Sequence, residues 1–177
     1  MQIYEFSHTI HDFVLQKNFN EALGFFKHNK TSVNQKEIKD NEYLIADMLT
    51  SLRGIKAFEA AYQFLHIYNI TIEASTPLRI LNSYGWLLYA ALKDSYTDMD
   101  KSQLSKLAHE RRLLELMQIL HVKVQQEAHG ATIKHTVNLI GYLFILISQH
   151  VKAENKPNYS FLKELYGYSG DIDPSFR

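Results

Sequence analysis

The sequence predicts an all-α fold, and three observations lead to that prediction. Apolar residues recur three and four positions apart along almost the whole chain of 177 residues, which is the spacing of one helix face. Seven Gly and three Pro are too few for the frequent tight turns of an all-β fold. No segment shows the sustained alternation of apolar and polar residues that is typical of a strand.

Four helices are expected in the first half of the chain, each identified by its apolar stripe. The first two run from about Ile3 to Val14 and from Phe19 to Phe26. The polar segment 31–40 is expected to connect them to a third helix, which carries Tyr43 and stops near Gly54. A fourth helix follows over residues 58–68.

Four more helices are expected in the second half. The fifth covers residues 77–92, with a proline in the first turn, where its missing N–H costs nothing. The polar segment 94–100 is expected to be a loop, and a long sixth helix follows over residues 104–124. The seventh helix covers residues 132–152, and a short eighth lies at 161–166.

The charge balance and the absence of cysteine limit the function classes. Lys plus Arg and Asp plus Glu number 19 each, so the basic excess of a dedicated nucleic-acid binder is missing. Without cysteine there is no disulfide framework, no cysteine zinc site and no thiol nucleophile. The chain start has no signal-peptide pattern, and the apolar stretch 137–147 is too short to cross a bilayer. We expect a soluble, cytoplasmic protein that does not engage a membrane.

Two segments of the first half repeat one pattern. In the segments 16–26 and 56–65, a polar turn is followed by an aromatic residue, a small residue and further aromatic residues. Phe19 corresponds to Phe58, and Ala22 corresponds to Ala61. The small alanine permits close contact between paired helices, while the aromatic residues fill the space on either side.

These segments resemble the turn and second helix of a tetratricopeptide repeat. The family's first-helix signature, a large residue followed by Gly and an aromatic residue one turn later, resembles the sequence around Gly85 and Gly141. Ile10 and Leu49 fill the glycine position in the first two units, which departs from the family pattern. The four positions are separated by 39, 36 and 56 residues, against a family period of about 34.

The resemblance implies a single domain over residues 1–177, a right-handed α-α superhelix of about four helix pairs with an irregular third pair. The expected units cover approximately residues 3–30, 40–70, 77–126 and 131–168. The alternative is an irregular helical bundle whose helix pairs imitate repeats by chance.

No pattern in the sequence predicts chemistry. The nine histidines show no HExxH spacing, so neither a metal site nor a cofactor is expected. Glycine-rich phosphate loops and nucleophile-elbow motifs are also missing. We expect a non-enzymatic protein, and an enzyme with an unrecognised helical site is the weakest alternative.

The resemblance implies that the first helices of the pairs line a concave face that binds a peptide, a helix or a neighbouring domain of a protein partner. The family positions that line this face hold Tyr, Trp, Arg, His and Asn, residue types that form contact hot spots. The candidate partner-binding residues are His11, Tyr43, Asp47, Arg53, Arg79, Asn82, Trp86, Tyr89, Asn138 and Tyr142. Tyr4 and His8 occupy equivalent positions in the first unit. The clamp with which some family members grip a free C-terminus is not reproduced at the matching positions.

Two further surfaces are candidates for contacts. The basic face around Lys101 to Arg112 suggests, as the alternative function, a nucleic-acid-associated helical domain, although nucleic acid is not the expected partner. The C-terminal tail carries Tyr159, Phe161, Tyr166 and Tyr168, which could mediate a homodimer or a contact with a larger assembly.

Overall fold

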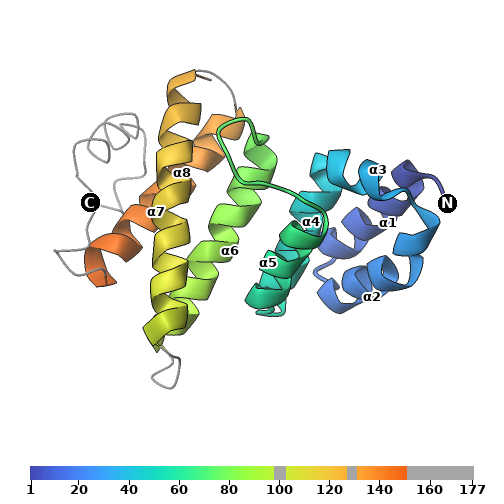
Figure 1. Cartoon of the computed structure of the whole chain (residues 1–177), viewed down its shortest axis with the longest axis horizontal. Helices are drawn as coiled ribbons and strands as arrows, with labels where there is room; N and C mark the ends of the chain where they lie inside the picture. The colour runs from blue at the N-terminus through green and yellow to red at the C-terminus, as the bar shows by residue number, and fades with distance from the viewer. Residues whose placement is uncertain (98–102, 127–130, 151–177) are drawn as a thin grey trace. The chain divides into compact units, whose positions relative to one another are not determined.

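The chain forms helices wherever the sequence shows the helical spacing of apolar residues. A computed structural model describes residues 1–97, 103–126 and 131–150, and within these ranges it contains eight α-helices, one short 3-10 helix and no strand (Figure 1). In chain order the elements are α1 (Ile3–Leu15), α2 (Phe19–Asn29), η1 (Lys30–Ser32), α3 (Gln35–Asp40), α4 (Glu42–Gly54), α5 (Phe58–Ile67), α6 (Leu78–Thr97), α7 (Gln103–Gln126) and α8 (Ala131–His150). The predicted all-α class is therefore confirmed for the described residues. The predicted helix at 161–166 and the aromatic tail lie outside them.

The helices belong to two units, residues 1–91 and 92–177, and the boundary falls within α6. In the first unit, α1 packs against α2 and α4 packs against α5, while α1 and α2 both contact α4. The predicted small residues Ala22 and Ala61 are fully buried in these pairs. In the second unit α7 packs against α8, with Leu116 and Leu143 among the buried side chains.

Aromatic side chains join the two helix pairs of the first unit. The Phe26 ring lies 5.6 Å from the ring of Phe6 on α1. It also lies 5.7 Å from Phe64 on α5 and 6.0 Å from Tyr68, both in edge-on orientations that aromatic pairs favour. Phe26 therefore contributes to the packing within its own pair and between the pairs.

The turns that close the two pairs have the same backbone geometry, 39 residues apart. Lys17 and Lys56 have φ angles of 59° and 58°, in the left-handed region. The N–H of Asn18 donates to the carbonyl of Phe13 at 2.8 Å, and the N–H of Ala57 donates to that of Leu52 at the same distance. The N–H groups of the two lysines donate to the carbonyls three residues earlier, each at 3.0 Å. Both turns are Schellman motifs, so the sequence repeat is also a repeat of backbone conformation.

The prediction that residues 31–40 form only a polar connection is wrong, because η1 and α3 lie there. The Asn34 side chain accepts a hydrogen bond from the N–H of Lys36 at 2.9 Å. The Glu37 carboxylate in turn accepts from the N–H of Asn34 at 3.2 Å, which completes a capping box. Ile38 is fully buried and anchors this short helix.

The prediction of a loop at 94–100 is wrong for its first four residues, because α6 continues to Thr97. Polar side chains at the end of α6 form hydrogen bonds that are compatible with a helix. The Thr97 hydroxyl bonds to the carbonyls of Lys93 and Asp94, at 3.1 and 3.0 Å. The Tyr96 hydroxyl donates to the Glu110 carboxylate of α7 at 2.7 Å. Burial raises the pKa of Tyr96, and the bond to Glu110 and its negative charge raise it further.

Replacing Lys17 or Lys56 with Gly should stabilise the first unit by up to about 1 kcal/mol each. A side chain with a Cβ costs roughly 1–2 kcal/mol in the left-handed region, and the greater freedom of unfolded Gly offsets part of the gain. Urea unfolding followed by the fluorescence of Trp86, the only tryptophan and a first-unit residue, measures the effect. The matched control is Lys27→Gly in the last turn of α2, which should lose up to about 1 kcal/mol. A loss of similar size at Lys17 would contradict the strain argument.

Two glycines of the first unit should respond to alanine in opposite directions. A Cβ on Gly54 would lie 2.8 Å from Cγ of Phe19 and nearer still to two other carbons of that ring, whereas a Cβ on Gly24 would meet nothing within 4 Å. Gly54→Ala should therefore destabilise by about 1–3 kcal/mol through overpacking. Gly24→Ala should stabilise by about 1 kcal/mol through helix propensity. The same unfolding measurement applies, and equal effects at both sites would refute the proposed close contact with Phe19.

Candidate functional site

Three helices of the first unit carry the same arrangement of partly exposed side chains. On each helix the four positions are spaced i, i+3, i+7 and i+10, so that they share one side of the helix. The rows are Tyr4, Ser7, His11 and Val14 on α1; Tyr43, Ala46, Thr50 and Arg53 on α4; and Arg79, Asn82, Trp86 and Tyr89 on α6. All of them except Ala46 keep part of their surface exposed. We call these twelve residues the three-row face.

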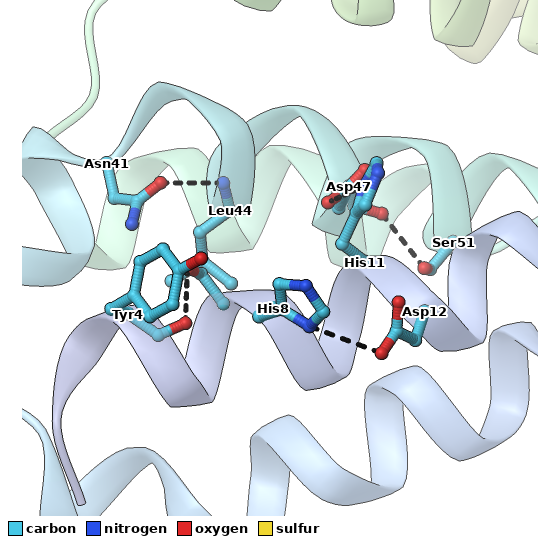
Figure 2. Close-up of polar contacts among 9 residues, drawn as sticks. Tyr4, His8, His11, Asp12, Asn41, Leu44, Asp47 and Ser51 are labelled. Carbon is cyan, nitrogen blue, oxygen red and sulfur yellow. Dashed lines mark hydrogen bonds and ion pairs between the residues drawn. The ribbon is translucent and has the colours of Figure 1, made fainter.

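A hydrogen bond between His11 and Asp47 joins the α1 row to α4. His11 Nδ1 lies 3.0 Å from Asp47 Oδ2, and it donates to this carboxylate when it carries the proton (Figure 2). The His11 side chain keeps 43% of its surface exposed, whereas that of Asp47 keeps 13%. The backbone carbonyl of Asp47 also accepts a hydrogen bond from the Ser51 hydroxyl at 2.9 Å. Asp47 is therefore held at the edge of the core, with His11 between it and solvent.

Burial raises the pKa of the Asp47 carboxyl above its usual value. The hydrogen bond from His11 acts in the opposite direction, as do the charges of His11 and Arg79, but burial outweighs them. Ionised Asp47 is thus less favourable in the folded protein than in the unfolded chain. This is the opposite of an ordinary surface carboxylate that gains an ion pair on folding.

A cation–π contact joins the α4 row to the α6 row. The guanidinium carbon of Arg79 lies 4.1 Å from the centroid of the Tyr43 ring, within the range for this interaction. Both residues are in the first turns of their helices, and both are exposed. The α6 row continues with Trp86 and Tyr89, whose rings are 5.7 Å apart at 83°. Both rings are half-buried, so Trp86 lies neither fully in the core nor fully in solvent.

The structure brings together four of the ten residues predicted to bind a partner, namely His11, Tyr43, Asp47 and Arg79. Arg53, Asn82, Trp86 and Tyr89 extend the α4 and α6 rows. The two remaining candidates, Asn138 and Tyr142, lie on α8 in the second unit, exposed and half-buried respectively.

A second histidine–carboxylate contact lies beside the row of α1 and was not predicted. His8 Nδ1 lies 3.2 Å from Asp12 Oδ2 one turn later, and the Tyr4 ring lies 6.0 Å from the His8 ring (Figure 2). The i,i+4 spacing of His8 and Asp12 was the sequence signal for this pair. The contact between His11 and Asp47 has no local signal, because it joins two helices.

The described residues contain no group of three or more His, Asp or Glu side chains that could hold a metal ion. The basic face predicted around Lys101 to Arg112 is engaged in local contacts where its side chains are described. Lys106 Nζ lies 4.5 Å from the centroid of the Tyr96 ring, and Arg111 Nε lies 3.1 Å from Glu115 Oε1. His109, on the same helix, is buried.

No protein-family model, curated protein or solved structure matches the chain. Among the described helices, none is both long and apolar enough to span a membrane.

Replacing Asp47 with Asn should change how stability depends on pH. Because the pKa of Asp47 is higher in the folded protein than in the unfolded chain, protonation of its carboxyl stabilises the fold. This stabilisation is fully present below the pKa of an unfolded carboxyl, about 4, and is lost as pH rises through the folded pKa. The amide introduced by Asp47→Asn does not ionise, so the variant should gain stability relative to the natural chain as pH rises above the pKa of an unfolded carboxyl. Paired urea titrations at each pH measure this difference, in which the other carboxyls cancel. A relative loss with rising pH would show that the His11 contact outweighs burial.

Proposed function

We propose that the chain is a non-enzymatic protein-interaction module, similar to tetratricopeptide proteins, that binds a segment of a protein partner on the three-row face. In this proposal the first helices α1, α4 and α6 form the inner, concave layer of a superhelix, and α2 and α5 form its outer layer. The second unit would supply a further helix pair, α7 and α8. The module would act in the cytoplasm.

The observation that carries the proposal is that side-chain contacts link the first helices α1, α4 and α6 in series. His11 reaches Asp47 across α1 and α4, and Arg79 covers Tyr43 across α4 and α6. Arg79 and Tyr43 hold equivalent positions in their rows and are neighbours, as expected for adjacent repeats of a stacked array. The two Schellman turns at Lys17 and Lys56 support the same repeat.

The composition of the face also favours partner binding over a purely structural role. Tyr4 and Tyr43, which occupy the same position in the first two rows, are 71% and 53% exposed. Exposed tyrosine, half-buried tryptophan and arginine are the residue types that contribute most to protein–protein contacts. These residues gather on one face, whereas apolar residues without a binding role are usually scattered singly over the surface.

A nucleic-acid-associated role through the Lys101–Arg112 face stays a second candidate. The contacts of Lys106 with Tyr96 and of Arg111 with Glu115 give it no specific support. Its signature would be binding that weakens steeply with salt.

Partner capture from the native host should depend on the three-row face. The full chain is immobilised and compared with Tyr43→Ala and Trp86→Ala, which remove exposed aromatic surface from the face. The matched control is Ile67→Ala, which removes apolar surface of α5 that is 64% exposed. Proteins identified by mass spectrometry should be retained by the natural chain and the control and lost, by about tenfold or more, from the face variants.

Circular dichroism of each variant confirms folding before capture is compared. Nuclease treatment and moderate salt separate protein partners from those bridged by nucleic acid. If every retained protein binds all four chains equally, the three-row face is not the binding surface.

A further inference from the structure

The Arg53 guanidinium is a half-buried cation to which no described carboxylate forms an ion pair. Arg53 lies in the last turn of α4, where a positive charge is favoured by the helix dipole. Burial lowers its pKa, and no nearby negative charge counters that effect. Taking a charge partly out of water without a partner costs free energy, so the position is suited to an anion that arrives from outside.

Arg79, the other arginine of the three-row face, is preorganised by the Tyr43 ring beneath it. A guanidinium stacked on an aromatic ring keeps its N–H groups at its edge, where they can bind a carboxylate with two parallel hydrogen bonds. Arg79 is exposed, and within the described part of the chain its guanidinium forms no ion pair shorter than 4 Å. The stack also reduces the freedom that the side chain would lose on binding.

The spacing of the two arginines fits an extended segment. Arg53 lies ten residues after Tyr43 on α4, which corresponds to about 15 Å along the helix axis, and Arg79 lies on Tyr43. In an extended chain, residues i, i+2 and i+4 point to one side, and i and i+4 are about 13 Å apart. Two long arginine side chains can therefore reach carboxylates at i and i+4. The side chain at i+2 would then face the middle of the rows, near Trp86.

We infer that the three-row face recognises an extended acidic segment of a partner protein, with carboxylates at i and i+4 held by Arg79 and Arg53 and an apolar residue at i+2 against Trp86. The inference rests on the interaction role proposed above and adds the chemistry of the partner. The Asp47 carboxylate, beside the face on α4, is close enough for the charge of Arg79 to act on it, and it is hydrogen-bonded to His11. In this inference carboxylate side chains, and not a free C-terminus, supply the negative charge.

Fluorescence anisotropy with the full chain tests the inference directly. The probe is a labelled, C-terminally amidated peptide, Gly-Ser-Glu-Ser-Leu-Ser-Glu-Ser-Gly, in which the two Glu residues stand at i and i+4. The reference peptides carry Gln or Lys in place of both Glu residues. The Glu peptide should bind about tenfold or more tightly than the Gln peptide, the Lys peptide should not bind, and added salt should weaken the Glu complex.

Variants assign the effect to the two arginines. Arg53→Gln and Arg79→Gln should each weaken the Glu peptide by about tenfold while leaving the weak binding of the Gln peptide unchanged. Arg53→Lys and Arg79→Lys keep the charge and should lose less. Lys27→Gln changes the net charge equally but lies on α2, so it should bind as the natural chain does. Circular dichroism and Trp86 fluorescence confirm that each variant is folded.

Equal binding of the Glu and Gln peptides, or unchanged binding by both Gln variants, would overturn the inference. The inference would also be overturned if a single-stranded RNA oligonucleotide bound through Arg53 and Arg79 while the Glu peptide bound no better than the Gln peptide. The two arginines would then be binding phosphate groups. These outcomes do not decide whether the chain has the proposed interaction role. Partner capture that depends on Tyr43 and Trp86 but not on either arginine would sink only the acidic-segment inference.

Discussion

The rest of the first unit depends on the backbone turn that closes each helix pair. In both pairs, the residue after the lysine with positive φ donates its N–H to the carbonyl five residues before it. The lysine itself donates its N–H to the carbonyl three residues before it. These bonds satisfy the carbonyls at the end of the first helix and fix the direction in which the second helix starts. Because the direction is fixed, Ala22 and Ala61 can meet the neighbouring helix closely and are fully buried. The outward side of the first helices is then left for the rows that begin with Tyr4 and Tyr43.

The pKa values of Asp47, beside the three-row face, and of Arg53, on it, are set by burial more than by pairing. Asp47 has a raised pKa although His11 and Arg79 are close, because the carboxylate lies at the edge of the core. Arg53 has a lowered pKa for the same reason. Both charges make the fold less favourable than neutral side chains of similar size would. Residues of this kind are often retained for binding, where a ligand supplies the missing charge or hydrogen bond.

The sequence predicted local features well and contacts between helices poorly. The positions of α1, α2, α4 and α5 follow from the spacing of their apolar residues, and the buried alanines follow from the repeat. Helix α3 was missed although Asn34 and Glu37 form a capping pattern, because its six residues carry a single buried apolar side chain, Ile38. The end of α6 was missed because its polar residues look like a loop until their partners are known. The contact between Arg79 and Tyr43 joins residues 36 positions apart, the same separation as Leu49 and Gly85, so the repeat register assigns them equivalent positions but does not show that their side chains touch.

The left-handed turns also determine where the chain can change in length. Each turn closes within its own pair, and the register of 39 residues between the pairs includes the connection that holds η1 and α3. Residues inserted at Thr31 or Ser32, which are exposed, would lengthen this connection without touching either turn or the buried Ile38 of α3. Insertion there leaves the backbone bonds of both turns intact, and an exposed connection tolerates added length at low entropic cost. The connection is therefore the natural point at which to splice in a tag, a linker or a foreign epitope while both helix pairs stay as they are.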